Sequence, residues 1–255
     1  MERIRWFFQL FWIGICAVAM VVQSGLLLDV RDSSPWLAAF VFSATVFGYH
    51  FAAPLPLRLP AWIAGVAGGW CFLHLPIFQQ LAITIPATIW LFYYGIRWPE
   101  LAGLRRYPVL KPVAIALAWA WVTVWLPFPL SVWTGAGALF VGRMAFIFAL
   151  ALAYDWCDLA NDRRQGFNTL VMQMGAVQSL RLMDIALLVA AGCAGLNVFL
   201  LHYTPATLLA LLLSLVLSAV VIRWLPRQKQ LGYWRKIGID ALMVVQLVLV
   251  WWAKK

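Results

Sequence analysis

Charged side chains, and acidic ones above all, are scarce in this sequence. Only 11% of the 255 residues are charged and 9 residues are Asp or Glu, whereas hydrophobic residues make up 65%. So few polar side chains cannot cover the surface of a water-soluble domain. The sequence also lacks the polar and apolar alternation of a membrane β-barrel. It therefore predicts a membrane helical bundle, because only helices and closed barrels satisfy the backbone in hydrocarbon.

Two further absences exclude classes of function. The four cysteines, Cys16, Cys71, Cys157 and Cys193, have neither metal-ligand spacing nor a paired extracellular arrangement, so we expect neither a zinc site nor a disulfide framework. The net charge of +10 is scattered between apolar segments and forms no basic patch with interleaved aromatic residues. We therefore expect membrane lipids, and no nucleic acid, as partners.

Apolar runs bounded by proline, glycine or charge predict about nine transmembrane helices in a single domain over residues 1–255. The first run is long enough to span a membrane, so we expect it to be retained rather than cleaved as a signal peptide. The predicted spans are 6–28, 35–53, 60–76, 78–97, 111–128, 133–154, 181–202, 205–225 and 236–253.

The distribution of lysine and arginine predicts how the bundle is oriented. All of the 19 Lys and Arg residues except Arg31, Arg143, Lys254 and Lys255 fall at the N-terminus or in every second loop. Cytoplasmic loops are enriched in these residues. The pattern predicts a cytoplasmic N-terminus and a C-terminus on the opposite side, and we expect the bacterial inner membrane as the location.

The scarce acids are concentrated where the sixth predicted span meets the following cytoplasmic loop. Asp155, Asp158 and Asp162 have the spacing i, i+3, i+7, which on a helix aligns the three carboxylates along one face. Such a row repels itself unless something positive is bound. Mg²⁺ with a diphosphate-bearing lipid is the natural candidate. The alternative is a solvated ion-pair cluster, in which Arg163, Arg164 and other basic residues neutralise the acids.

The string D-x-x-D-x-x-x-D-x-x-x-G from Asp155 to Gly166, followed by Thr169, resembles the second aspartate-rich motif of the UbiA superfamily of intramembrane prenyltransferases. Nine helices, and Asp240 near the start of the last one, fit the same plan. The resemblance implies an all-α, UbiA-like membrane bundle. It also implies transfer of an isoprenoid group from a diphosphate donor to a lipophilic acceptor, with Mg²⁺ held by Asp155, Asp158 and Asp162. Gly166 and Thr169 would shape the loop.

The first aspartate-rich motif of that superfamily, N-x-x-x-D-x-x-x-D, is missing. No Asp or Glu lies between Asp32 and Glu100. The positional counterparts of its three polar residues are His50, Pro54 and Arg58. This departure leaves half of the metal site without ligands.

A second segment resembles a divergent, Bacteroidetes-type subgroup of the superfamily. It runs from Leu104 to Pro112 and is followed by Trp119 and Pro127. Members of this subgroup keep the second motif and lack the first, as this sequence does.

Basic and aromatic residues complete the predicted site, and each has a plainer alternative. For Arg58, topology alone favours the plainer alternative, a loop residue on the positive side. For Arg143, inside an apolar span, the alternative is a structural pair with Asp155, Asp158 or another buried acid. His50 and the tryptophans around Trp119 also suit core packing. The predicted diphosphate-binding residues are Arg58, Lys111, Arg143, Arg163 and Arg164, and those of the substrate cavity are Tyr49, His50 and Trp119.

Two acidic residues outside the aspartate row, Asp184 and Asp240, each follow a basic residue by one helical turn. Asp240 follows Lys236 by four residues, and Asp184 follows Arg181 by three. This spacing predicts an ion pair within each helix.

Two functions remain open from the sequence. The first is a prenyltransferase in which the aspartate row binds Mg²⁺-diphosphate. The second is a catalytically degenerate protein of the same fold that serves as a lipid-binding or structural subunit of a membrane complex. A transporter has less support, because the sequence shows no matched pair of broken helices.

Overall fold

The computed structural model describes residues 2–30, 34–51, 59–94, 103–133, 135–164 and 166–255, and within these ranges the chain forms helices and no β-strand. The long helices are α1 Glu2–Leu27, α2 Pro35–Phe51, α3 Leu59–Leu73, α4 Ile77–Tyr94, α5 Leu110–Ala120, α7 Gly137–Arg164, α8 Leu170–Leu200, α9 Pro205–Trp224 and α10 Trp234–Ala253. The short elements are η1 Leu104–Arg106, the π-helical turn η2 Trp121–Trp125, α6 Leu130–Trp133, η3 Leu225–Arg227 and η4 Lys229–Leu231.

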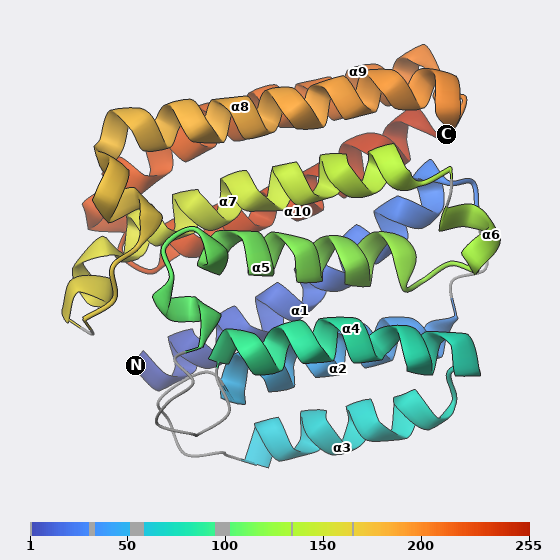
Figure 1. Cartoon of the computed structure of the whole chain (residues 1–255), viewed down its shortest axis with the longest axis horizontal. Coiled ribbons are helices and arrows are strands. Elements are labelled where there is room, and N and C mark those ends of the chain that lie inside the picture. The colour runs from blue at the N-terminus through green and yellow to red at the C-terminus, as the bar shows by residue number, and fades with distance from the viewer. Residues whose placement is uncertain (1, 31–33, 52–58, 95–102, 134, 165) are drawn as a thin grey trace.

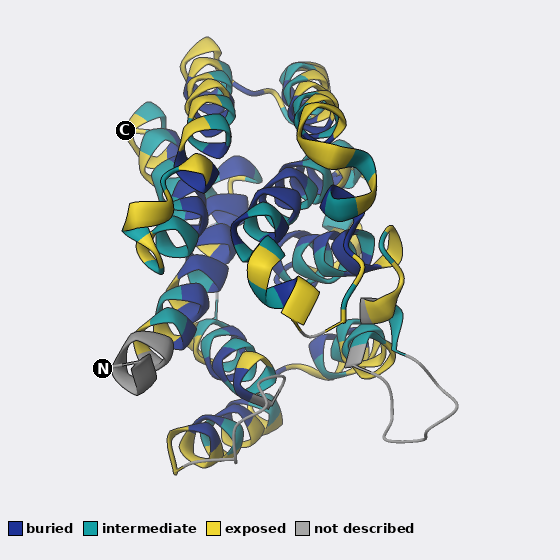
Figure 2. Cartoon of the chain, turned by 90° about the vertical axis from the view of Figure 1, so that its left-hand side faces the viewer, coloured by how far each residue is buried: buried dark blue, intermediate teal, exposed yellow. Residues whose placement is uncertain are grey.

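The long helices lie side by side along one direction, with the N-terminus at one end of the bundle and the C-terminus at the other (Figure 1). α7 packs against both α5 and α8, α1 packs against α2 and α10, and α3 packs against α2 at one edge. Viewed along the helices, buried residues face the centre and exposed residues face outward (Figure 2). α5 and α7 run in opposite directions, so the end of α7 meets the start of α5.

Large apolar side chains cover the outer surface as well as the core. Phe146 and Met183 are fully buried between the helices, but Leu188, Phe199 and Leu209 are 70%, 78% and 66% exposed on α8 and α9. An apolar exterior of this kind is stable in lipid and not in water. The structure therefore agrees with a multi-pass membrane protein.

By length and composition, five helices in the described residues are able to cross a membrane: α1, α7, α8, α9 and α10. α3, α4 and α5 are apolar but shorter. Each of the predicted apolar segments overlaps a helix. The number of helices that cross the membrane stays a prediction.

The aspartate row lies on a helix rather than in a loop. α7 continues ten residues past the predicted end of the span at 154 and ends at Arg164. Gly166 then adopts a φ of 73°, its N–H donates to the Arg163 carbonyl at 3.2 Å, and the Phe167 N–H donates to the Asp162 carbonyl at 2.9 Å. These two bonds form a Schellman motif, which satisfies the last carbonyls of a helix. The apolar run ends at residue 154, so hydropathy predicted the end of α7 too early. The residues that actually cap the helix, around Gly166, lie in the polar segment that follows.

A threonine caps the start of each of the next two helices, α8 and α9. The Thr169 side chain accepts from the Met172 N–H at 3.4 Å at the start of α8, eleven residues before the span predicted there. Thr204 caps α9 in the same way, accepting from the Thr207 N–H at 3.2 Å. Each cap satisfies a free N–H of the first turn. Together with Gly166, Thr169 fixes the turn between α7 and α8.

Candidate functional site

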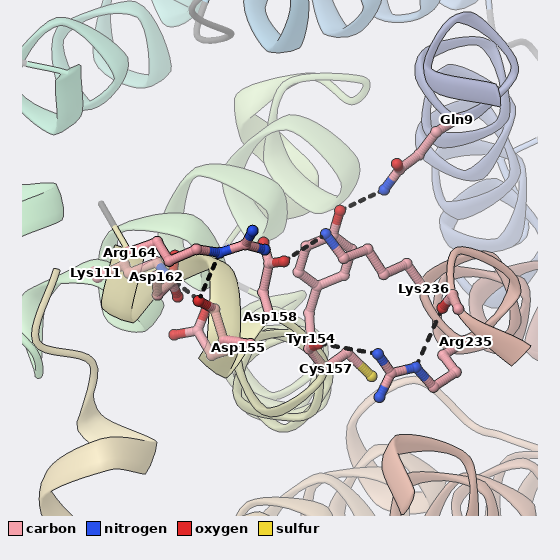
Figure 3. A network of polar contacts seen from close by, with 12 residues as sticks. Gln9, Lys111, Tyr154, Asp155, Cys157, Asp158, Asp162, Arg164, Arg235 and Lys236 are labelled. Atoms are coloured by element: carbon pink, nitrogen blue, oxygen red, sulfur yellow. Dashed lines mark hydrogen bonds and ion pairs between the residues drawn. The ribbon is translucent and has the colours of Figure 1, made fainter. Parts of the chain in front are cut away.

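A lysine from α5 lies between two of the three aspartates on α7 (Figure 3). The Lys111 Nζ is 2.7 Å from Oδ1 of Asp155 and 3.4 Å from Oδ2 of Asp162. All three side chains are at least nine-tenths buried. Asp155 and Asp162 are two helical turns apart on one face of α7, so a single ammonium contacts both carboxylates. We call this arrangement the Lys111 bridge.

The third aspartate meets a different lysine. Lys236, in the first turn of α10, places its Nζ 2.9 Å from Oδ1 of Asp158 and 4.9 Å from the centre of the Tyr154 ring. The predicted pair between Lys236 and Asp240 was therefore wrong, because α10 packs against α7 and presents Lys236 to Asp158. Lys236 was not predicted as a site residue. The sequence did place Lys236 at the start of the last predicted helix, on the same predicted cytoplasmic side as the aspartate row, and this position could have suggested the contact.

The predicted pair within α8 was also wrong. Asp184 forms an ion pair with Arg223 of α9 and not with Arg181 of its own helix. Packing of α8 against α9 brings this more distant cation to the carboxylate.

The carboxylates of the aspartate row are not gathered as a metal site would require. Among the described residues, no group of three or more His, Cys, Asp or Glu side chains is placed to hold a metal ion. Asp155 and Asp162 face Lys111, Asp158 faces Lys236, and Oδ2 of Asp155 is buried without a hydrogen-bond partner. The residues in this arrangement do not fit the Mg²⁺ site expected from the sequence. Magnesium binding stays a prediction from the sequence.

An apolar cavity of about 340 Å³ begins one helical turn after Lys111. It lies mainly between α2, α4 and α5, and within α5 it is lined by Ala114, Ile115, Ala118 and Trp119. Pockets of this size are typical of small-molecule ligands. The other aromatic side chains in its wall are Phe40, Phe47, Tyr49, Trp90 and Tyr93.

Two of the three predicted cavity residues line this space. Tyr49 and Trp119 are part of its wall, and Trp119 Nε1 donates to the Tyr49 hydroxyl at 3.4 Å. His50 is buried in α2 but is not among the residues that line the cavity. Tyr49 and His50 are adjacent residues of α2, and adjacent side chains point about 100° apart around an α-helix. The sequence did not show which of the two directions faces the cavity.

The neighbouring tryptophans, Trp121 and Trp125, are not among the residues that line this cavity. The Trp125 ring stacks on Trp133 and Phe140, at centroid distances of 5.5 and 3.7 Å, and Trp121 packs edge-on against Trp125. For these two residues, core packing is the observed role.

The predicted diphosphate-binding residues are dispersed. Lys111 forms the bridge, whereas Arg163 and Arg164 are exposed in the last turn of α7, where Arg164 Nε donates to the Ala160 carbonyl at 3.3 Å. Arg58 lies outside the described residues.

Arg143 is far from the aspartate row. Twelve residues of helix, about 18 Å, separate it from Asp155. It is 3% exposed, contacts Met20 Sδ, and donates to the Met20 carbonyl at 3.4 Å and to Ser24 Oγ at 3.1 Å. Among the described residues no carboxylate lies within ion-pair distance of it. The structure therefore places Arg143 away from the aspartate row and without an acidic partner among the described residues, and its role in binding a diphosphate stays a prediction.

A further polar contact joins α1 to the site. Gln9 Nε2 donates to the hydroxyl of Tyr154, the residue that precedes Asp155 (Figure 3). Neither residue was predicted as part of the site. Their sequence context is apolar, and only the packing of α1 near α7 reveals the contact.

Comparison with known proteins identifies the fold. No protein-family profile and no curated protein matches the sequence. A solved structure of digeranylgeranylglyceryl phosphate synthase, a membrane protein, superposes with a TM-score of 0.61 at 14% sequence identity, over 100% of this chain and 98% of that chain. This synthase is a UbiA-superfamily prenyltransferase. At this identity the likeness concerns the fold alone, and it confirms the UbiA-like fold expected from the aspartate motif.

Proposed function

We propose that this protein binds an isoprenoid diphosphate inside the membrane and transfers its prenyl group to a lipophilic acceptor. The observation that carries the proposal is the continuity along α5, where the Lys111 bridge is followed one turn later by the apolar cavity. A ligand with a phosphorylated head and a hydrocarbon tail matches this order of polar and apolar surfaces. The UbiA-like fold supports the same assignment.

The hydrocarbon part of the donor would lie in the cavity. Its wall is almost entirely apolar and includes the aromatic rings of Tyr49, Trp90 and Trp119. Aromatic faces attract cations, and an allylic carbon that loses diphosphate develops positive charge. These rings would therefore hold the chain and stabilise the charge that forms on it.

The diphosphate would lie at the end of the cavity nearest Lys111. An ammonium has three N–H donors, of which Lys111 directs two at carboxylates. Arg163 and Arg164 add exposed positive charge at the same end of α7. In the transfer, the bond from the allylic carbon to the diphosphate oxygen breaks and a bond to the acceptor forms. The acceptor loses a proton, and diphosphate leaves.

The test is a transfer assay with the purified chain in lipid vesicles. Isoprenoid diphosphates of several lengths are supplied with lipophilic acceptors, with and without Mg²⁺. We expect release of diphosphate together with an alkylated acceptor. No release with any donor and acceptor class would contradict the catalytic proposal.

A substitution in the cavity tests where the chain binds. Ala118→Phe places a ring in the cavity and should weaken donor binding about 5- to 150-fold, because overpacking costs about 1–3 kcal/mol. Leu91→Phe is the matched control, since Leu91 is an exposed residue of α4 outside the cavity wall. Equal effects of the two substitutions would place the isoprenoid chain elsewhere.

A second candidate is a lipid-binding subunit of a membrane complex that does not catalyse transfer. It is favoured by the pairing of every aspartate in the row with a lysine, because these ion pairs need no ligand. Asp158→Asn combined with Asp162→Asn separates the two functions. For a structural subunit the double variant loses stability or co-purifying partners, whereas for an enzyme it loses transfer while assembly is kept.

A further inference from the structure

We propose that Lys111 is the resident cation of the aspartate row, so that the wild-type chain binds no divalent metal between Asp155 and Asp162. The inference deepens the proposed function, because it makes the diphosphate end of the site one that works without metal. Its evidence is the geometry of the Lys111 bridge, and its test requires no isoprenoid.

The bridge meets the electrostatic need that a metal would otherwise meet. Asp155 and Asp162 are 5% and 3% exposed, and two buried carboxylates on one helix face repel each other without a shared cation. Lys111 is 8% exposed and lies within 3.4 Å of both. A lysine ammonium is a compact point charge and can contact both carboxylates at once.

The backbone at the start of α5 fixes where this cation enters. The Lys111 N–H donates to the Tyr107 carbonyl at 3.0 Å, in the turn that follows η1. α5 packs against α7, so the lysine side chain reaches the aspartates from a neighbouring helix. Lys111 is therefore held at the row by the packing of the bundle.

A divalent ion and the lysine compete for the same place. Mg²⁺ requires oxygen ligands in near-octahedral geometry at about 2.1 Å. Reaching the same two carboxylates would bring the ion against the ammonium, and like charges in a partly dehydrated site repel strongly. Removal of the lysine charge should open the site to metal.

The second lysine of the cluster provides a matched control. Lys236 also pairs with an aspartate of α7, but it contacts Asp158 alone, and both side chains are about one-fifth exposed. Lys236→Met removes the same charge from the same end of the bundle and frees one carboxylate instead of two. It should not create a metal site.

The experiment titrates the purified chain in detergent with Mn²⁺, a spectroscopic substitute for Mg²⁺. We expect no saturable site in the wild type, one site in Lys111→Met, and none in Lys236→Met. Adding Asp155→Asn to Lys111→Met should abolish the new site. A wild-type Mn²⁺ site that Asp162→Asn removes would overturn the inference, as would a folded Lys111→Met variant that acquires no site.

Thermal unfolding covers the case in which Lys111→Met folds poorly. We expect its midpoint to fall by about 5–15 °C, since two buried carboxylates lose their partner, and to recover in millimolar Mg²⁺. The unfolding midpoint of the wild type should not change with Mg²⁺. If Mg²⁺ raises that midpoint, and Asp162→Asn abolishes the increase, Lys111 is not the resident cation. If Lys111→Met cannot be purified, the wild-type titration decides.

Failure of the proposed function is a separate result. If the wild-type chain transfers no prenyl group and binds no Mn²⁺, the proposed transfer is wrong, but Lys111 is still the resident cation. If the wild-type chain transfers prenyl groups and binds Mn²⁺ at Asp155 and Asp162, the proposed function is correct and the inference about Lys111 is wrong.

Discussion

Lys111 and Arg143 are both buried cations, but their partners differ in kind. Lys111 contacts two carboxylates, whereas the polar partners of Arg143 are the Ser24 hydroxyl and the Met20 carbonyl. Removing one partner of a buried ion pair strands the other charge, and this loss is usually larger than the net stability of the pair. Neutral partners lose only a hydrogen bond.

This contrast predicts unequal effects of the same substitution. Lys111→Met should lower the free energy of unfolding by about 3–5 kcal/mol, because Asp155 and Asp162 are left buried without their cation. Arg143→Met should lower it by about 1–2 kcal/mol, the value of hydrogen bonds that leave neutral groups behind. Denaturation of both variants in the same detergent measures the difference. Equal losses would mean that Arg143 balances a charge outside the described part of the chain.

At the scale of the element, the turn between α7 and α8 determines where the aspartate row ends. Gly166 has a φ of 73°, a conformation that costs little only for glycine. The Schellman motif at Gly166 ends α7 two residues after Asp162, and Thr169 caps the start of α8. These residues keep the row in the last turns of a helix that packs against α5.

Substitutions at this turn should destabilise the end of the bundle. We expect Gly166→Ala to cost about 1–2 kcal/mol through its left-handed backbone and Thr169→Ala about 0.5–2 kcal/mol through loss of the cap. Gly192→Ala in α8 is the control, since its φ is not positive and its added methyl group meets no atom within 4 Å. That change should be neutral or stabilising, because alanine favours helices more than glycine does. The thermal unfolding midpoints of the three variants test these expected differences in stability.

At the scale of the whole molecule, the two ends of the bundle differ in charge. Exposed cations surround the end that carries the aspartate row, including Arg106, Arg163, Arg164, Arg227 and Lys229. At the other end, Lys254 pairs with Asp29 at 2.6 Å, and the Lys255 Nζ lies 3.7 Å from the centre of the Trp251 ring. This asymmetry is consistent with the predicted cytoplasmic position of the aspartate row, and both the orientation and the bacterial inner membrane stay predictions.

Reporter fusions test this orientation. Alkaline phosphatase is active only outside the cytoplasm, so a fusion after Lys255 should be active and a fusion after Lys229 inactive. The N-terminus and C-terminus lie at opposite ends of the bundle, so the same experiment places both (Figure 1). An active fusion after Lys229 would reverse the orientation and place the aspartate row on the outer side.

The sequence by itself determined the properties that depend on composition and on local spacing. The scarcity of charge required a lipid environment, and the spacing of Asp155, Asp158 and Asp162 required a common helix face. The motif also indicated the UbiA-like fold, which the superposition confirms. Each of these follows from residues close together in the chain, where helix geometry is enough to place them.

Only the tertiary structure decided which groups meet the aspartates. Arg163 and Arg164 are adjacent to Asp162 in sequence but lie exposed, whereas Lys111, 44 residues before Asp155, forms the bridge. Lys236 likewise reaches Asp158 from another helix, and Arg143 lies far from the row. The physical reason is that the partner of a buried charge is chosen by the packing of helices distant in the chain, and residue spacing within one helix carries no information about that packing.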